Sequence, residues 1–271
     1  MPELPEVQTV VNQIKSDLLR NKVESITPIW PKVLHNFTSE KAKQKIKDGE
    51  ILDVSRRAKF IIIKFAESII AIHLRMTGKL YLLPENQTIS KYATAYFTLK
   101  NKRKLIFDDV RKFGRIYLYK NIKPIDERHG PEPLESNFTS ESLFRLIKSK
   151  KRNIKALLLD QSMIAGLGNI YADESLWKSK IHPNSLSHKI PKKRIEDLYN
   201  NIKIILTEAI EQNGTTIIDF SVNGESGKYT NELKIYGKVN SNCYRCKYKI
   251  IKIRVAGRGT YICKKCQKKY K

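Results

Sequence analysis

The first twenty residues carry apolar side chains at intervals of three and four. The residues concerned are Val7, Val10, Val11, Ile14 and Leu18. This spacing gathers side chains on one face of a helix. Proline is favoured in the first helical turn, and an acidic residue there suits the helix dipole. With Pro5 and Glu6 at its start, the segment is predicted to form a helix over residues 5–20.

Short apolar runs separated by turn residues follow this helix. They cover residues 23–29, 51–54, 60–65, 69–73, 79–83, 93–99, 104–107 and 115–119. Runs of this length and spacing are typical of short strands. So many strands in succession favour a β-sandwich or barrel, with the first helix packed on it.

The pattern changes to helical after a segment rich in proline and glycine. Residues 121–136 contain Pro124, Gly130, Pro131 and Pro133, which indicates a linker. Helices are predicted at residues 140–148 and 154–159. A longer amphipathic helix carries Ile195, Leu198, Ile202, Ile205, Leu206 and Ala209, and it ends before Asn213-Gly214. Residues 214–232 are expected to form a polar loop.

The charge of the chain is strongly positive. Lys and Arg number 52 against 27 Asp and Glu, giving +25, an excess that indicates a polyanionic partner. Nucleic acid is the first candidate and an anionic membrane surface the second, although a general drift toward lysine-rich composition would also raise the charge. No apolar run approaches the roughly 18 residues of a membrane span, and no signal peptide is visible. We therefore expect a cytosolic protein that does not enter a membrane.

All four cysteines belong to one pattern, in which Cys243 and Cys246 are followed by Cys263 and Cys266. Two Cys-x-x-Cys knuckles predict a tetrahedral, four-thiolate, structural Zn²⁺ site. The segment between them indicates a β-hairpin with Arg258 at its tip. From Cys243 onward the chain has basic residues and no acidic ones. This segment is either a solvated basic tail or a finger that presents Arg258 to a phosphate, and the zinc frame favours the finger.

The N-terminus offers a nucleophile. If Met1 is removed, Pro2 becomes a terminal secondary amine. An ordinary α-amine has a pKa of about 8, and a neutral secondary amine can form an iminium ion with an aldehyde carbon. Glu3 and Glu6 lie beside it in sequence. The alternative interpretation is that the segment only begins a helix.

Two further motifs suggest DNA contacts. In residues 161–174, Gly166 and Gly168 precede Asn169, so a tight turn would lead into a helix N-terminus that can bind phosphate. Alternatively, this is a plain corner between two helices. Residues 73–76 and 109–114 combine flexible apolar, aromatic and arginine side chains that could fill a gap in a base stack. Such residues are more often ordinary core and surface positions.

Taken in order, six features resemble bacterial formamidopyrimidine-DNA glycosylase. They are Met-Pro-Glu-Leu-Pro-Glu-Val at 1–7, Arg-Arg-Ala-Lys at 56–59, Asp-Val-Arg-Lys-Phe-Gly at 109–114, Gly-Pro-Glu-Pro-Leu at 130–134, Gly-Leu-Gly-Asn-Ile-Tyr at 166–171 and the terminal four-cysteine finger. The resemblance spans residues 2–268. It implies an α+β fold with an N-terminal β-sandwich, a helical helix–two-turns–helix domain and a C-terminal zinc-finger hairpin. The corresponding ranges are 1–120, 137–232 and 233–271, with the linker at 121–136.

The resemblance also implies an activity and catalytic residues. The family removes oxidised purines from duplex DNA and then cuts the strand at the abasic site. Pro2 resembles the Schiff-base nucleophile, and Glu3 resembles the general acid/base. Lys59 resembles the lysine at the lesion's phosphate, and Arg258 resembles the finger arginine that assists the second elimination. The zinc ion is structural, the partner is damaged double-stranded DNA, and we expect a monomer in the bacterial cytoplasm.

The expected DNA contacts follow from the same resemblance. Met76, Arg111 and Phe113 resemble the trio that fills the void left by the extruded base, and Asn169 resembles the phosphate-binding asparagine. Lys150 and Lys155 lie where the family places basic contacts, and Tyr92 stands where the family commonly has a histidine. The segment 217–228, which resembles the family's base-capping loop, departs from the family pattern.

Two other functions remain open at this point. One is an endonuclease VIII-like glycosylase for oxidised pyrimidines, and the other is a catalytically inactive DNA-binding protein on the same scaffold. The presence of Pro2 and Glu3 favours an enzyme over the inactive protein.

Overall fold

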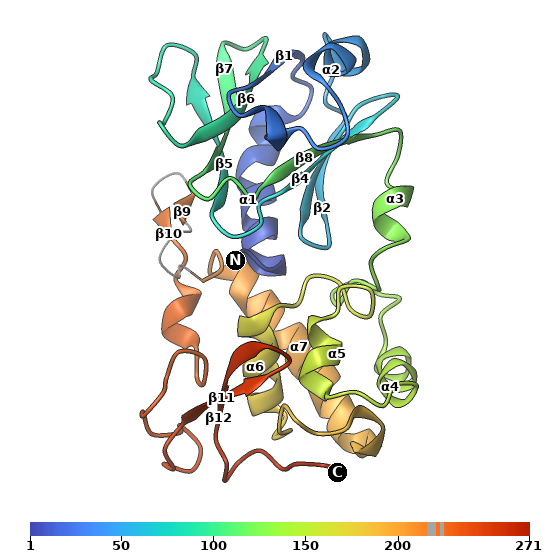
Figure 1. Cartoon of the computed structure of the whole chain (residues 1–271), viewed down its shortest axis with the longest axis vertical. Coiled ribbons are helices and arrows are strands. Elements are labelled where there is room, and N and C mark those ends of the chain that lie inside the picture. Colours follow the sequence, from blue (N-terminus) through green and yellow to red (C-terminus); the bar gives the residue numbers. More distant parts are fainter. Residues whose placement is uncertain (216–220, 223–224) are drawn as a thin grey trace. The chain divides into compact units, whose positions relative to one another are not determined.

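The computed structural model describes residues 1–215, 221–222 and 225–271 (Figure 1). The chain divides into two compact units. The first comprises Met1–Glu127 and Asn213–Lys228, and the second comprises Arg128–Gln212 and Tyr229–Lys271.

The first unit contains two four-stranded antiparallel sheets. Their strand orders are β1-β6-β7-β5 and β2-β3-β4-β8. The strands are β1 (Val23–Pro28), β2 (Asp53–Arg57), β3 (Phe60–Lys64), β4 (Ile69–His73), β5 (Gly78–Pro84), β6 (Ala93–Leu99), β7 (Arg103–Asp109) and β8 (Arg115–Tyr119). Both sheets contribute to one shared apolar core, and in β3, β4, β6, β7 and β8 alternate residues point into it, as the two-residue period of a strand requires.

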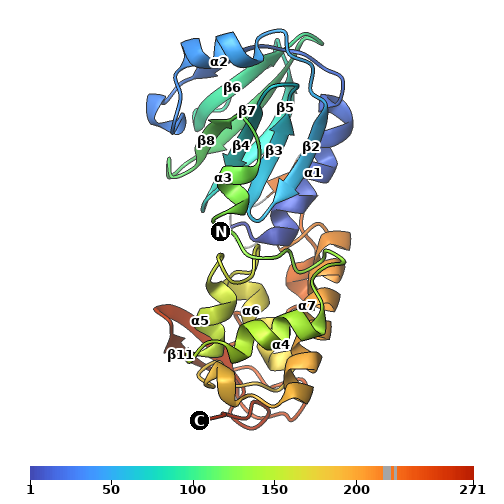
Figure 2. The ribbon, with the colours of Figure 1, turned by 90° about the vertical axis from the view of Figure 1, so that its right-hand side faces the viewer.

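Two helices complete that core. In α1 (Leu4–Leu18), the apolar positions that predicted the helix are all buried, and the helix lies beside β2 (Figure 2). The second helix, α2 (Ser39–Ile46), contributes Ala42 and Ile46 to the same core. The predicted β-sandwich with a packed N-terminal helix is therefore confirmed.

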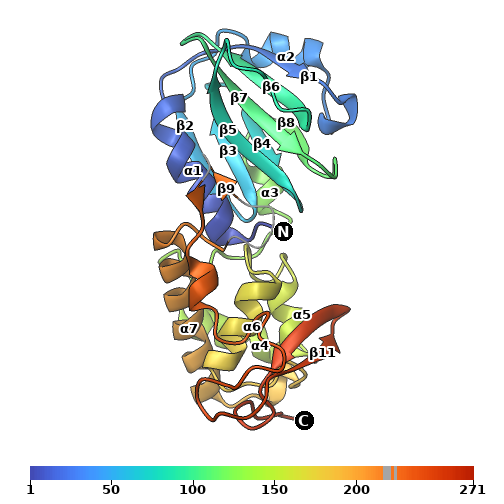
Figure 3. The ribbon, with the colours of Figure 1, turned by 90° about the vertical axis from the view of Figure 1, so that its left-hand side faces the viewer.

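The second unit is built around α6 (Asn169–Lys178), which packs against α5 (Ile154–Leu159) and α7 (Lys192–Glu211). The first helix of this unit is α4 (Ser140–Lys148), which also packs against α7. A hairpin of β11 (Ile251–Val255) and β12 (Arg258–Ile262) lies beside α6 (Figure 3). The helical part and the hairpin thus form one compact unit.

Several short elements were not predicted from the sequence. They are the single-turn helices η1 (Pro31–Val33), η2 (Ser187–Lys189) and η3 (Tyr229–Glu232), the helices α2 and α3 (Lys123–Asp126), and the two-residue strands β9 (Ser221–Val222) and β10 (Glu225–Ser226). The helix α3 lies in the segment predicted as a linker, where Ile125 joins a small apolar cluster on the β2-β3-β4-β8 sheet.

Two local predictions need adjustment. The strand predicted over residues 51–54 is β2 and runs to Arg57. Arg258 does not form the tip of the finger hairpin, because Ala256 and Gly257 make the turn with positive φ angles of 50° and 72°, and Arg258 is the first residue of β12. The predicted module ranges 137–232 and 233–271 differ from the limits of the compact units and stay a prediction.

Among the residues that the structure describes, no helix combines the length and the apolar character needed to cross a bilayer.

Candidate functional site

The N-terminal residues lie at the start of α1. Met1 is exposed, whereas Pro2 and Glu3 are buried. Glu3 has extended backbone angles and is the N-cap residue of α1. Its backbone N–H donates to Glu6 Oε2 over 2.8 Å. The chain thus enters the helix with its second and third residues fixed against the protein.

The carboxylate of Glu6 also binds the second segment of the first unit, which begins at Asn213. Its Oε1 accepts hydrogen bonds from the Thr215 backbone N–H at 2.9 Å and from the Thr215 hydroxyl at 3.0 Å. Gly214 lies against the same side chain, since a Cβ atom there would approach Oε1 to 2.9 Å. Buried Glu6 therefore links the N-terminal residues to the segment that begins at Asn213.

The turn between β2 and β3 carries Lys59. Ala58 adopts a positive φ of 52° in this turn, and the Lys59 residue is 6% exposed. Arg56 donates to the Ala58 carbonyl at 2.9 Å and to Gln8 of α1 at 3.2 Å. These bonds hold the turn against the first half of α1.

Asp109 organises two exposed loops. Its buried carboxylate accepts from the Gly114 N–H at 2.6 Å, from the Arg111 N–H at 3.1 Å and from the Thr77 hydroxyl. The Thr77 hydroxyl oxygen also accepts from the Arg111 N–H at 3.2 Å. The loop after β4, with Met76, and the loop after β7 are therefore tied together.

Large apolar side chains stay exposed around these two loops. Met76, Tyr92 and Phe113 are between 41% and 47% exposed, and exposed apolar groups of this size mark an interaction surface when they cluster. The Arg111 guanidinium stacks on the Phe113 ring at 4.8 Å. The Tyr92 carbonyl accepts from the Asp109 N–H at 3.0 Å. The structure thus brings together Met76, Tyr92, Arg111 and Phe113, which are distant in sequence.

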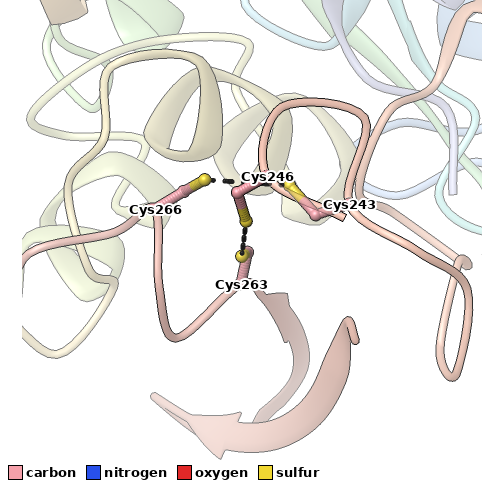
Figure 4. Close-up of side chains that lie close together, drawn as sticks. All are labelled: Cys243, Cys246, Cys263 and Cys266. Atoms are coloured by element: carbon pink, nitrogen blue, oxygen red, sulfur yellow. Dashed lines mark hydrogen bonds between the residues drawn. The ribbon is translucent and has the colours of Figure 1, made fainter. Parts of the chain in front are cut away.

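The four cysteines of the second unit converge on one point (Figure 4). Their Sγ atoms all lie within 4.8 Å of one another. The Cys243–Cys266 Sγ distance is 3.8 Å and the Cys246–Cys263 distance is 3.4 Å. Tetrahedral thiolates at 2.3 Å from zinc would be about 3.8 Å apart. The donor set and its spacing fit one structural zinc ion.

The finger is anchored on α6 by two consecutive buried acids. Glu174 accepts hydrogen bonds from the backbone N–H groups of Lys234, Ile235 and Tyr236 at 2.9–3.1 Å. Asp173 Oδ2 accepts from the Tyr261 N–H of β12 at 3.0 Å. Burial raises the pKa of both carboxyls, that of Asp173 to about 6. Lys155 lowers the pKa of Asp173, and backbone hydrogen bonds lower the pKa of both carboxyls, but burial outweighs these effects.

The basic residues predicted in this unit differ in exposure. Lys150 and Arg258 are exposed, and Asn169 is the first residue of α6, where the positive end of the helix dipole lies. Lys155 is fully buried, and its ammonium group donates to Asp173 Oδ1 at 2.6 Å and to the Thr260 hydroxyl at 2.7 Å. In this conformation a direct contact of Lys155 with DNA is therefore not possible.

Three of the residues that organise the site carry no predicted role in the sequence. Asp109 opens a recognised motif, but only its hydrogen bonds in the structure show that it holds the loops. Asp173 is the second residue after the Gly-Leu-Gly-Asn-Ile-Tyr motif, and Thr260 lies within the finger. Asp173 and Glu174 are adjacent acidic residues in α6, and no local sequence pattern marks either of them as buried.

The fold and the four-cysteine cluster define a class of protein in which a β-sandwich is joined to a helical unit that carries a zinc finger. The descriptions of three family models give the family. The formamidopyrimidine-DNA glycosylase N-terminal domain matches residues 1–116, and the H2TH domain of the same glycosylase matches residues 129–221. A zinc finger found in FPG and IleRS matches residues 242–269. The chain belongs to the formamidopyrimidine-DNA glycosylase family.

Relatives cover the chain over its full length. The formamidopyrimidine-DNA glycosylase of Protochlamydia amoebophila is 40% identical over 99% of this chain and 100% of its own length. The one of Lactobacillus acidophilus is 39% identical over 100% of both chains.

Solved structures agree with the sequence relatives. A Lactococcus lactis FPG variant in complex with Fapy-dG-containing DNA superposes with a TM-score of 0.93 at 36% identity, covering 99% of this chain and 100% of that one. The Lactococcus lactis protein bound to DNA with an abasic site gives 0.92 at 36% identity, with coverage of 98% and 100%. The family and the fold expected from the sequence are confirmed, and so is the structural zinc site.

Proposed function

We propose that this protein is a bifunctional DNA glycosylase and abasic-site lyase that removes oxidised purines from duplex DNA. The observation that carries the proposal is the match of the glycosylase N-terminal model from residue 1 onward, which includes Pro2 and Glu3 at the start of α1. The proposed substrates are 8-oxoguanine and formamidopyrimidines. Because the relatives are bacterial proteins, we place the activity in the bacterial cytoplasm, on chromosomal DNA.

The first step requires an extruded nucleotide. A damaged base inside a duplex is out of reach, so the enzyme must flip the nucleotide at a cost of a few kcal/mol. The exposed cluster of Met76, Arg111 and Phe113 suits the vacated space, because flexible and stacked apolar groups can replace a base in the stack. Tyr92, Lys150 and Asn169 are proposed to bind the phosphate backbone.

Pro2 is the proposed nucleophile. Once Met1 has been removed, the Pro2 nitrogen attacks C1′, the glycosidic bond breaks, and the base leaves after taking up a proton. The sugar ring opens as the bond between C1′ and O4′ breaks and O4′ accepts a proton, which leaves an iminium ion between Pro2 and C1′. Glu3 is the proposed acid/base for these proton transfers.

Two eliminations then cut the strand. The iminium ion acidifies the C2′ proton, and its loss expels the 3′ phosphate as the C3′–O bond breaks. Loss of the C4′ proton then expels the 5′ phosphate as the C5′–O bond breaks. Water releases the sugar fragment and regenerates the Pro2 amine. Lys59 is proposed to assist the first elimination and Arg258 the second, each as a cation beside a phosphate.

The zinc ion supplies structure when bound, because four thiolates leave no open coordination position. The chain's own residues then hold the finger. Trp177 donates its indole N–H to Cys243 Sγ at 3.4 Å, and Gln267 donates to the Ile181 carbonyl at 2.9 Å.

Borohydride trapping tests the proposal. Protein whose N-terminal residue has been confirmed as Pro2 by mass spectrometry is mixed with duplex DNA carrying 8-oxoguanine opposite cytosine, and borohydride is added. We expect a covalent protein–DNA band that disappears in an N-terminally extended protein and decreases strongly in Pro2→Gly. If the band is absent while lesion DNA is still bound tightly, the protein is a binding protein.

A substrate comparison separates the two glycosylase classes. Single-turnover excision is measured on 8-oxoguanine and on an oxidised pyrimidine in otherwise identical duplexes. Faster excision of the purine is expected. Excision of the pyrimidine at a tenfold greater rate would assign the protein to the endonuclease VIII-like class instead.

A further inference from the structure

Three consecutive residues of β12 are tied to the helical part of the second unit by different side chains. The Gly259 carbonyl accepts from Asn169 Nδ2 at 3.0 Å. The Thr260 hydroxyl accepts from Lys155 Nζ at 2.7 Å. The Tyr261 N–H donates to Asp173 Oδ2 at 3.0 Å. These ties begin one residue after Arg258, so they fix the strand from which that side chain projects.

At the centre of these ties lies a fully buried ion pair. Lys155 and Asp173 each have 0% side-chain exposure, and Nζ and Oδ1 are 2.6 Å apart (ion pair). Burying two charges is costly, and well-packed apolar residues would commonly give equal or greater stability. Such a pair fixes geometry, because each charged group must meet its partners at defined positions. Stability alone does not account for it.

The hydroxyl of Thr260 extends the ion pair to Arg258. It accepts a hydrogen bond from Lys155 and donates its own proton to the Arg258 carbonyl at 3.0 Å. A hydroxyl can do both at once, since it has one donor hydrogen and two lone pairs. Thr260 is itself fully buried, whereas Arg258 is exposed. Two hydrogen bonds of the Thr260 hydroxyl therefore connect the buried ion pair to the backbone of the exposed Arg258.

The hairpin turn before Arg258 does little to hold that residue in place. Ala256 and Gly257 lie between the paired residues Val255 and Arg258, and a Cβ at Gly257 would meet nothing within 4 Å. The turn thus makes few contacts, and Arg258 follows it directly. The position of the guanidinium depends on the strand behind it.

We propose that Lys155, Asp173 and Thr260 form a positioning brace that sets Arg258 for the second elimination. The inference rests on the proposed function, in which Arg258 stabilises the departing 5′ phosphate. Lys155 then acts through the finger, not by touching DNA. Arg258 is the catalytic residue, and the three members of the brace are positioning residues.

Thr260→Val tests the brace with a minimal change, because valine keeps the shape and lacks the hydroxyl. The variant is assayed on DNA with a preformed abasic site, and the products of the first and second eliminations are separated on a gel. We expect the first elimination and borohydride trapping to stay within twofold of the wild type. The second elimination should slow about tenfold or more, since small misplacements of a catalytic group have effects of this size. Thr260→Ser keeps the hydroxyl, and its second elimination should proceed at close to the wild-type rate.

A second pair of variants separates positioning from stability. Lys155→Met leaves Asp173 buried without its cation and should lower the melting temperature. Lys155→Met combined with Asp173→Asn removes both charges and should regain much of that temperature, with the zinc content unchanged. The second elimination should stay slow in the double variant, because Thr260 still lacks its donor. Recovery of the second elimination in step with the melting temperature would reduce the brace to a structural role and overturn the inference.

Arg258→Ala separates the proposed role of Arg258 from the proposed role of the brace. If Arg258→Ala leaves the second elimination unchanged, the proposed role of Arg258 fails and the brace has nothing to position. If Arg258→Ala slows that step and Thr260→Val does not, the proposed function stands and the brace is wrong.

Discussion

Glu6 shows how one buried carboxylate can join distant parts of a site. It binds the Glu3 N–H with one oxygen and two donors of Thr215 with the other. A carboxylate suits this position because all three partners are donors and it has only acceptors to offer. The same side chain therefore holds the Glu3 backbone, next to Pro2, and the segment that begins at Asn213.

Glu6→Gln should loosen both connections. The amide of glutamine presents an NH₂ group to at least one of the donors, and a buried donor left unsatisfied costs about 1–3 kcal/mol. Amide hydrogen exchange at Glu3 and Thr215 should accelerate about tenfold or more. Glu24→Gln, at an exposed position of β1, serves as the control and should leave both amides unchanged. Equal protection in Glu6→Gln and the wild type would show that the carboxylate does not hold these segments.

Gly114 limits the loop that carries Arg111 and Phe113. A Cβ at this position would lie 2.4 Å from the Phe107 ring and 3.1 Å from Asp109 Oδ2. Phe107 is fully buried, so its ring cannot move aside freely.

Gly114→Ala should therefore both destabilise the first unit and misplace the loop. Overpacking of this kind costs about 1–3 kcal/mol, and we expect a lower melting temperature and weaker binding of lesion DNA. Gly237→Asn is the matched control, because a Cβ there meets nothing within 4 Å and asparagine tolerates its positive φ of 76°. If both variants bind lesion DNA equally well, the loop does not contribute to binding.

At the scale of elements, apolar periodicity predicted the positions of helices and strands correctly where the pattern was strong. The repeat in residues 5–20 predicted α1 (Leu4–Leu18) to within two residues. The helix α2 was missed because only Ala42 and Ile46 of its eight residues are buried, which leaves too few apolar positions to show a period. The β2 strand was cut short because its last residues, Arg56 and Arg57, are polar and give no strand signal.

Site residues could be predicted from the sequence where a local motif specifies their role. They could not be predicted where the role depends on a partner that is distant in the sequence. The four cysteines have a spacing that specifies zinc, and the structure brings them together. The family resemblance placed Lys155 among the basic DNA contacts, but the structure buries its side chain. Its partners lie 18 and 105 residues away, at Asp173 and Thr260, and no local pattern connects them.

Zinc removal should act on the finger and leave the sandwich folded. Metal binding and folding are coupled in small thiolate sites, and Trp177 packs against Cys243 in this cluster. In a Trp30→Phe background Trp177 is the remaining tryptophan, so its fluorescence reports on the finger. A strong chelator should release about one zinc per chain, shift this fluorescence and abolish tight DNA binding. Unchanged fluorescence after complete zinc loss would mean that the finger is held by its other contacts.

At the scale of the whole molecule, the charge of +25 is distributed over both units, and each unit has its own proposed phosphate contact. Lys59 belongs to the first unit and Arg258 to the second. Neutralising phosphates releases counterions, so the logarithm of the binding constant falls linearly with the logarithm of salt concentration. The slope of that line counts the phosphate contacts, independently of where the two units lie.

Lys59→Ala and Arg258→Ala should each reduce the magnitude of this slope by about one, and the double variant by about two. The measurement is a fluorescence-anisotropy titration with abasic-analogue duplex DNA at a series of salt concentrations. Lys43→Ala, on the exposed side of α2, removes the same charge from a position with no proposed contact and should leave the slope unchanged. An additive loss would mean that one DNA molecule is held by both units. If the double variant lost no more than either single variant, only one of these two residues would bind phosphate, and the role assigned to the other would be wrong.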